Sequence, residues 1–156
     1  RRRLEIIQGL AQAGVPAGVL VSPLIPGLTD SDLERILELA AKAGATRAGS
    51  ILIRLPLEVA GLFEDWLRAH YPDRAERVLG LIRQCRGGRL NDPDFDSRMR
   101  GSGPVAELLA QRFRLAARRL GLDPHPERPG SGWDLDSTQF RRPRPPGTQL
   151  SLFEGA

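Results

Sequence analysis

The sequence predicts an α/β fold, because two apolar runs, each preceded by the end of a helix, lie on either side of a well-marked helix. Gly14 and Gly44 each close a helical pattern, and glycine suits the left-handed conformation that ends helices. The apolar runs 17–22 and 48–54 follow them, as expected of strands covered on both faces. A β-α-β order implies parallel strands with a right-handed crossover. Such a unit belongs either to an open sheet or to a (β/α) barrel.

The helix between the two expected strands has a marked start and one apolar face. Ser31 and Glu34 form the S-x-x-E pattern of a capping box. Apolar residues recur at helical spacing and form one stripe, made of Leu33, Ile36, Leu37, Ala40 and Ala41. We expect this stripe to face the core.

Two parallel strands cannot bury both faces alone, and the chain opens directly on a helical pattern, "RRRLEIIQGLAQAG". We therefore expect the C-terminal part of a longer protein, whose preceding portion supplies further strands. After the second strand the pattern turns helical, and from Gly121 onward it becomes rich in Pro and Gly, as in flexible tails. The expected organisation is 1–56 for the last βα units, 57–120 for a helical region and 121–156 for a disordered tail.

The amino-acid composition bears on the partners, the metal sites and the cellular compartment to be expected. Net charge is +4, and arginine supplies nearly all of the positive charge, since Lys42 is the only lysine. This is compatible with nucleic-acid binding and equally with the codon usage of a high-GC genome. Cys85 is the single cysteine, so neither a disulfide framework nor a cysteine-based metal site can form within the chain. No apolar run is long enough to span a membrane, and we expect a cytoplasmic protein.

Two segments follow the expected strands, "SPLIPGLTD" (22–30) and "RLPLE" (54–58). Ligands of parallel α/β folds bind beyond the carboxyl ends of strands. Pro23 and Pro26 stiffen the first segment, and Gly27 would let the backbone approach a ligand closely. The alternative is a tight βα turn that only leads into the Ser31 cap.

The stretch "VSPLIPGLTDSDLERILELAAKAGA" resembles the fifth strand, loop and helix of radical S-adenosylmethionine (SAM) enzymes. The similarity is greater to their DNA-repair-photolyase-like branch, which resembles spore photoproduct lyase. "LIRLPLEVAGLFEDWLRAHYPDRAERVLGLIRQCRGG" and "RMRGSGPVAELLAQRF" extend the resemblance over roughly residues 1–120. It implies the C-terminal portion of a partial (β/α) TIM-type barrel, followed by helices and the tail.

The resemblance also implies which residues meet SAM. The family motif G-x-I-x-G-x-x-E aligns with 23–30, where Ile25 and Gly27 match, while Pro23 replaces Gly and Asp30 replaces Glu. In the family this segment packs against the adenine of SAM. The end of the sixth strand, at Arg54 and Leu55, would form the other edge that contacts adenine. The implied cofactor-binding residues are thus Pro23, Ile25, Gly27, Asp30, Arg54 and Leu55.

The cluster motif of the family, C-x3-C-x2-C, is absent from the chain. Thiolates are the ligands that a 4Fe–4S cluster requires, so we expect cluster and SAM to be used by a full-length parent and the cluster not to be bound by this chain. We assign it no catalytic residue and no metal ligand. Cys85 is either a buried thiol or, as in spore photoproduct lyase, a hydrogen-atom donor.

Arginines gather near the Gly-rich loop that follows residue 85. Four of them are candidates for contacts with nucleic-acid phosphates: Arg86, Arg89, Arg98 and Arg100. The alternative is a solvated face paired with the acids of the same loop, Asp92, Asp94 and Asp96.

The tail ends in "QLSLF" (149–153), which is similar to the pentapeptide Q-L-S/D-L-F by which bacterial polymerases and repair proteins bind the β sliding clamp. The resemblance implies that Leu152 and Phe153 fill an apolar pocket, Leu150 adds contact and Gln149 sets the register. The alternative is that these side chains pack back onto the domain.

Together these resemblances predict the C-terminal part of a radical SAM enzyme that acts on nucleic acid, lyase-like and engaged in DNA repair, with a tail that binds the clamp. The alternative is a non-catalytic adaptor for nucleic acid and clamp on a barrel scaffold. Neither reading involves a membrane.

Overall fold

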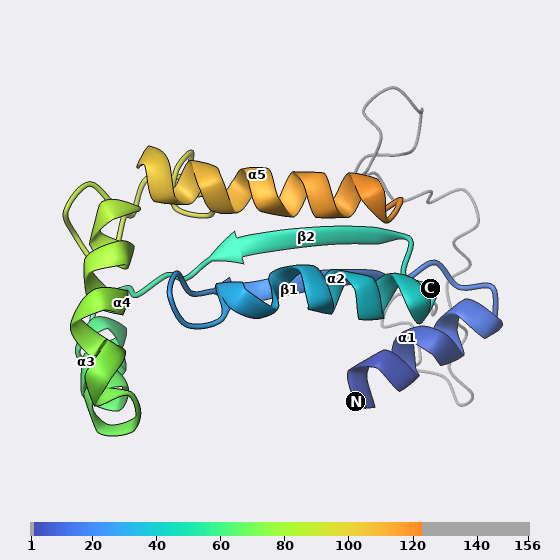
Figure 1. Ribbon diagram of the computed structural model, residues 1–156, viewed down its shortest axis with the longest axis horizontal. Coiled ribbons are helices and arrows are strands. Elements are labelled where there is room, and N and C mark those ends of the chain that lie inside the picture. The colour runs from blue at the N-terminus through green and yellow to red at the C-terminus, as the bar shows by residue number, and fades with distance from the viewer. Residues whose placement is uncertain (1, 123–156) are drawn as a thin grey trace, which may run out of the picture. The chain divides into compact units, whose positions relative to one another are not determined.

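The computed structural model describes residues 2–122, which lie within one compact unit. Two strands and five α-helices make up this part of the chain, with one short 3-10 helix, η1, before α2 (Figure 1). The elements are α1 (Arg2–Gln12), β1 (Gly18–Leu24), η1 (Asp30–Asp32), α2 (Leu33–Lys42), β2 (Arg47–Leu52), α3 (Val59–His70), α4 (Pro72–Gln84) and α5 (Gly103–Arg119).

The β-α-β unit that the sequence predicts is confirmed. Strands β1 and β2 pair in parallel, from Gly18 opposite Arg47 to Leu24 opposite Leu52, and α2 connects them. Gly14 and Gly44 have φ of 73° and 95°, the left-handed conformation expected after α1 and α2. Short apolar runs and helix-ending glycines were therefore sufficient to locate this unit.

The expected barrel is wrong. The described residues form a two-stranded sheet of order β1-β2, and no barrel is seen among them. Non-strand groups cover the outer edge of β2: Ala48 N donates to Leu122 O and Leu52 N to Met99 O, each at 3.0 Å. These bonds occupy positions that a third strand beside β2 would need. The (β/α) resemblance thus describes the local βαβ order and not the architecture of this part of the chain.

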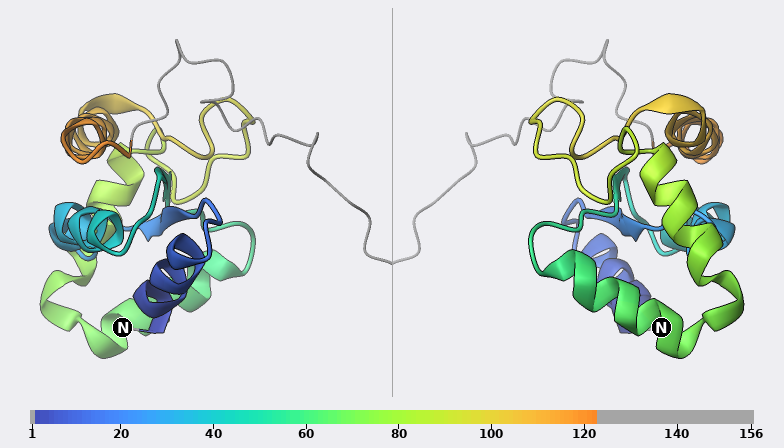
Figure 2. Two further views of the ribbon diagram at one scale, coloured as in Figure 1. Left: turned by 90° about the vertical axis from the view of Figure 1, so that its right-hand side faces the viewer. Right: turned by 90° about the vertical axis from the view of Figure 1, so that its left-hand side faces the viewer.

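One face of the sheet is buried. Figure 2 shows α2 and α5 side by side along the strands, and these two helices contact each other. The core cluster that these helices share with the sheet includes Val21 and Leu24 of β1 and Leu52 of β2, each no more than 6% exposed. On the other face Leu20 is 53% exposed. The expectation that both faces are covered therefore fails for β1, whereas β2 has no exposed residue on either face.

A second apolar cluster lies beyond the strand ends, where Figure 1 shows α3 and α4. Ile25 follows β1 and Ile53 and Leu55 follow β2, and they pack with buried residues of these two helices, Leu67, Ala75, Val78, Leu79 and Ile82. The carboxyl ends of both strands are thereby attached to the helical part of the chain.

The apolar stripe of α2 is confirmed at Leu33, Leu37 and Ala40, which are fully buried. The expected capping box is not formed. The helix begins after η1, at Leu33, and its N-cap residue Asp32 makes no side-chain cap hydrogen bond. The carboxylate of Glu34 instead binds Arg112 of α5. Glu34 thus binds a residue that is distant in sequence and not the local capping partner that the S-x-x-E pattern predicts.

Within residues 2–122, none of the helices combines the length and apolar character needed to cross a membrane.

Substitution of Gly44 by alanine should lower stability by about 1–3 kcal/mol, because the residue has φ of 95° and a Cβ would lie 2.6 Å from Ala11 Cβ. Gly61 within α3 is the matched control, since a Cβ there meets no atom within 4 Å. Gly61→Ala should raise stability by about 0.5–1 kcal/mol through helix propensity. Urea unfolding measures both, and a Gly44→Ala protein as stable as wild type would contradict the tight contact between α1 and the α2–β2 turn.

Candidate functional site

The loops that follow the two strands meet at one edge of the sheet. Because β1 and β2 are parallel, both carboxyl ends lie there, and Ile53 N donates to Leu24 O at 3.0 Å just beyond the paired residues. The predicted segments 22–30 and 54–58 thus start from neighbouring positions. This carboxyl-terminal end of the two strands, called the strand edge below, is the candidate functional site.

The loop after β1 is held by its own hydrogen bonds. Ile25 N donates to Thr29 Oγ1 at 2.9 Å, and Gly27 N donates to Asp30 Oδ1 at 2.7 Å. Thr29 Oγ1 in turn donates to Pro23 O at 3.3 Å. Asp30 therefore closes a turn on Gly27, which combines the two readings of this segment as a tight turn and as a presented loop.

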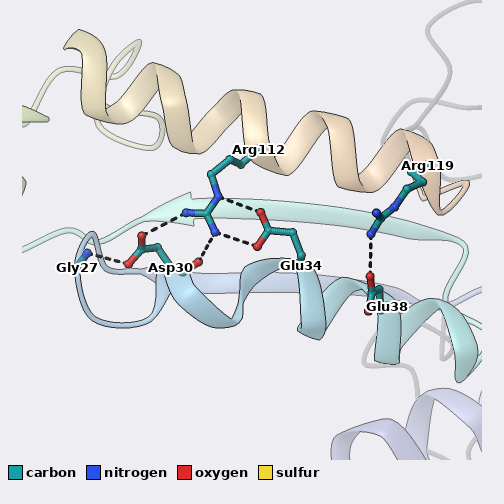
Figure 3. A network of polar contacts seen from close by, with 6 residues as sticks. All are labelled: Gly27, Asp30, Glu34, Glu38, Arg112 and Arg119. Atoms are coloured by element: carbon teal, nitrogen blue, oxygen red, sulfur yellow. Dashed lines mark hydrogen bonds and ion pairs between the residues drawn. The ribbon is translucent and has the colours of Figure 1, made fainter.

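Arg112 of α5 fixes this loop from outside (Figure 3). Its Nε and Nη2 bind the two carboxylate oxygens of Glu34, each at 2.9 Å. Its Nη1 binds Asp30 Oδ2 at 3.3 Å and its Nη2 binds Asp30 O at 2.8 Å. A planar guanidinium suits such a bidentate arrangement, which ties loop, α2 and α5 together. Nothing in the sequence pattern pointed to Arg112.

These contacts shift both titrating groups. The hydrogen bond from Arg112 holds the pKa of Glu34 below its usual value of 4.5, and the same bond raises the pKa of Arg112. Both side chains are about one-third exposed, so solvent screens the interaction.

Three of the residues implied to meet SAM serve packing. Ile25 and Leu55 are 7% and 2% exposed within the cluster against α3 and α4. A Cβ on Gly27 would lie 2.9 Å from Leu81 Cδ1, so the close approach that glycine permits here is to α4. The side chains of Ile25 and Leu55 thus support the strand edge from the core side.

The other implied residues are placed differently. Pro23 is exposed, and Asp30 is bound by Gly27 N and Arg112. Arg54 is half-buried, and its Nε has no hydrogen-bond partner within residues 2–122. A buried donor without an acceptor is unusual in a folded protein. Pro23 and Arg54 are thus the implied residues whose side chains are engaged neither in the second core cluster nor in the turn at Asp30.

The described residues do not fit an iron–sulfur cluster. They contain no group of three His, Cys, Asp or Glu side chains that could hold a metal ion. Cys85 is fully buried, and burial raises the pKa of its thiol, which disfavours the thiolate. The buried-thiol reading of Cys85 agrees with this position.

The four candidate arginines of residues 86–100 divide into three kinds. Arg86 is 3% exposed, and its guanidinium binds the carbonyl oxygens of Leu52, Ile53 and Ser97 at 3.3, 2.7 and 3.2 Å. It is thus turned to the backbone, away from a surface ligand. Arg98 lies over the Phe95 ring, 3.6 Å from its centroid. Arg89 and Arg100 are exposed.

The alternative for these arginines was pairing with the acids of the same loop. No ion pair joins them within the part of the chain that the structure describes. Asp92 accepts hydrogen bonds from Ser97 Oγ and from Asp94 N, and these bonds lower its pKa. Asp94 accepts from Asp96 N at 2.8 Å. The carboxylates organise the loop backbone, which leaves the exposed arginines to solvent or a ligand.

A pocket of about 270 Å³ adjoins the loop after β1 on the side of α4. Its lining residues are Gly27, Leu28, Asp30, Ser31, Arg74 and Arg77. Sequence reasoning found Gly27 and Asp30 but missed the two arginines, because they lie on a helix more than 40 positions further along the chain.

The helix α3 carries a group of rings that the sequence analysis also missed. Trp66 has neighbours at ring-centroid distances of 5.9 Å (Phe63), 5.4 Å (His70) and 5.5 Å (Tyr71). Trp66 and Tyr71 are 42% and 39% exposed. The spacing of Phe63, Trp66 and His70 by three and four residues places them on one helix face, which a helical reading of 57–71 could have shown.

The tail residues Gln149, Leu150, Leu152 and Phe153 lie outside the described residues.

Uncharacterized proteins of Mycobacterium bovis and Mycobacterium tuberculosis are 32% identical to the chain over 127 residues. The match covers 80% of this chain, and the chain spans about 36% of the length of these relatives. No protein family matches the chain, and no solved structure matches it.

Removal of the Arg112 side chain should lower the free energy of unfolding by about 1–2 kcal/mol near neutral pH, since it breaks a bidentate pair screened by solvent. Because the folded pKa of Glu34 lies below 4.5, the contribution is present above that pH and is lost as pH falls through the lowered value. Denaturant unfolding of wild type and Arg112→Ala across this range should show the difference shrinking in acid.

Arg119→Ala is the matched control for Arg112→Ala. Arg119 binds Glu38 at 2.7 Å, but the two side chains are 65% and 43% exposed. Its loss should cost less than about 1 kcal/mol. Equal costs for the two substitutions would contradict the structural role given to Arg112.

Proposed function

We propose that the chain is part of a radical SAM enzyme that acts on nucleic acid, lyase-like and related to the DNA-repair-photolyase-like branch. One observation carries the proposal. The stretch that resembles the fifth strand, loop and helix of that family forms β1, the loop 23–30 and α2, and this loop adjoins the end of β2 at a single edge. The resemblance requires this juxtaposition, because both loops would contact one cofactor.

Each residue of this edge would have a defined part. Pro23 and Arg54 would contact the adenosyl group, while Ile25 and Leu55 would support them from the second core cluster. Asp30, held by Arg112, would keep the loop in place before the cofactor arrives. SAM held at this edge would supply the radical chemistry of the family, in which hydrogen is abstracted from a substrate. The cysteines for the 4Fe–4S cluster would come from sequence beyond this chain, in a cytoplasmic enzyme.

The mycobacterial relatives provide the test, because most of their length lies outside the match. We expect that remainder to contain C-x3-C-x2-C on the N-terminal side of the matched region. Purified without oxygen, such a relative should show iron–sulfur absorbance and should form 5′-deoxyadenosine from SAM when dithionite is added. Its triple Cys→Ala variant is the control and should do neither.

A relative that lacks the cysteine motif, or that carries it and cleaves no SAM, would overturn the enzymatic proposal. The adaptor for nucleic acid and clamp would then be the better description, and it is favoured by the buried state of the chain's single cysteine.

For the tail, we propose that 149–153 binds the bacterial β sliding clamp. The sequence matches all five positions of the clamp-binding pentapeptide and follows a Pro-rich tether. A short peptide buries little area, so micromolar affinity is expected. Tethering would raise the effective concentration once the protein is also on DNA.

Replacing Leu152 and Phe153 together by alanine should weaken binding of the whole chain to the host's clamp at least tenfold, because apolar anchors carry most of the affinity of such peptides. Thr148→Ala, just outside the pentapeptide, is the control and should bind as wild type does. Surface plasmon resonance with immobilised clamp measures all three. Equal binding by the double variant would remove the clamp proposal.

A further inference from the structure

We propose that the pocket between the loop after β1 and helix α4 binds a backbone phosphate of single-stranded nucleic acid. Arg74 and Arg77 would supply the positive charge, and the hydroxyl of Ser31 a hydrogen bond. The choice of nucleic acid rests on the proposed function, whereas the anion chemistry rests on the pocket itself.

The pocket has two walls of different origin. One is the turn after β1, with Gly27, Leu28 and Asp30, and the other is the first half of α4. Arg74 and Arg77 are three residues apart on that helix, so both project from one face. A volume of about 270 Å³ is below the roughly 300–1,000 Å³ of pockets for drug-sized ligands. It suits one phosphate group with part of its sugar.

The charge in this pocket is positive, although an acid lines it. Both carboxylate oxygens of Asp30 are already engaged, since its Oδ1 accepts from Gly27 N and its Oδ2 from Arg112. Arg74 and Arg77 form no side-chain hydrogen bond or ion pair within residues 2–122. Two guanidinium groups without a partner in the described residues therefore line the cavity, and phosphate is an oxyanion that their planar donors suit.

Two acids lie near these arginines along α4, Asp73 and Glu76. Asp73 forms no ion pair with Arg74 or Arg77 within residues 2–122. Glu76 lies between the two arginines in sequence, but its carboxylate is directed to Arg68 of α3, at 3.4 Å. Arg68 also binds Glu64, at 3.1 Å. The arginine that has acidic partners is thus on α3, while the two on the pocket side of α4 have none.

The hydroxyl of Ser31 is likewise available. The capping bond that the sequence predicts for it is not formed, and the helix after it starts from Asp32 without a side-chain cap. Ser31 is exposed and lines the pocket opposite the arginines. A serine hydroxyl is among the usual side-chain contacts to phosphate oxygen.

The rings of α3 favour a single strand as the source of the phosphate. Tyr71 directly precedes α4, three residues before Arg74, and Arg74 N donates to Tyr71 O at 3.0 Å. Tyr71 and Trp66 are both partly exposed. Proteins that bind single strands combine basic contacts to the backbone with aromatic side chains on which unpaired bases stack.

The test is binding of a fluorescein-labelled single-stranded oligonucleotide to the whole chain, followed by anisotropy. Arg74→Glu/Arg77→Glu should weaken binding at least tenfold, and Arg74→Gln/Arg77→Gln should lower the slope of log K against log salt by about one. Arg35→Glu/Arg114→Glu is the control, since it reverses the same charges at exposed positions of α2 and α5. It should weaken binding far less.

Inorganic phosphate provides a second readout that does not depend on nucleic acid. Added to the nitrogen-15-labelled protein, phosphate should shift the backbone amide NMR resonances of Gly27 and Ser31 in wild type. It should not shift them in the Arg74→Glu/Arg77→Glu variant. Shifts of this kind without any loss of oligonucleotide binding in the variant would overturn the nucleic-acid assignment. If the control pair weakens oligonucleotide binding as much as the Arg74→Glu/Arg77→Glu pair does, and phosphate shifts no amide resonance, the pocket is not a phosphate site.

These outcomes are separable from failure of the radical SAM proposal. Absence of SAM cleavage by the relatives would leave oligonucleotide binding measurable in this chain, and loss of binding would leave SAM cleavage measurable in them.

Discussion

The buried guanidinium of Arg86 is the contact on which the candidate site depends. It lies two residues after α4 and binds the carbonyls of Leu52, the last residue of β2, and of Ile53, the next residue, together with Ser97 O from the following loop. Burial of a cation is costly unless its donors find acceptors, and burial here lowers the pKa of Arg86. Three carbonyl oxygens offset that cost. Because the contact occupies the outer edge of β2, it fixes where the sheet ends and where the loop 87–101 begins.

Arg112 plays the corresponding part at the other strand. It reaches from α5 to the loop after β1, and so the segment that follows each strand is bound by an arginine from later in the chain. The two arginines differ in surroundings. Arg86 is buried and binds neutral carbonyls, whereas Arg112 is partly exposed and binds carboxylates. Together they hold the strand edge in place, which a loop that must present backbone and side chains to a ligand requires.

Patterns local in sequence predicted the local structure. Apolar runs and the glycines at 14 and 44 located β1, α2 and β2, because helix ends and strands depend on neighbouring residues. The capping box failed for the opposite reason: Glu34 has a bidentate partner 78 positions away, which the S-x-x-E pattern cannot reveal. The prediction of a barrel was wrong because the outer edge of β2 is bonded to groups of Arg86, Met99 and Leu122. These residues lie in irregular segments that have no strand pattern in the sequence. The resemblance identified the strand-end loop but not the two arginines across from it.

The arginines of this chain look alike in sequence, and only their partners distinguish structural from ligand-binding roles. Arg86 was a candidate for phosphate and is enclosed, while Arg74 and Arg77 were not candidates, line a pocket and form no side-chain bond within residues 2–122. An arginine already bonded to carbonyls or carboxylates has little to gain from a phosphate, since a new contact would require breaking those bonds. An unpaired guanidinium beside a cavity gains the full interaction. A buried Nε without a partner does not make the same distinction, since Arg54, Arg86 and Arg98 all have one within residues 2–122.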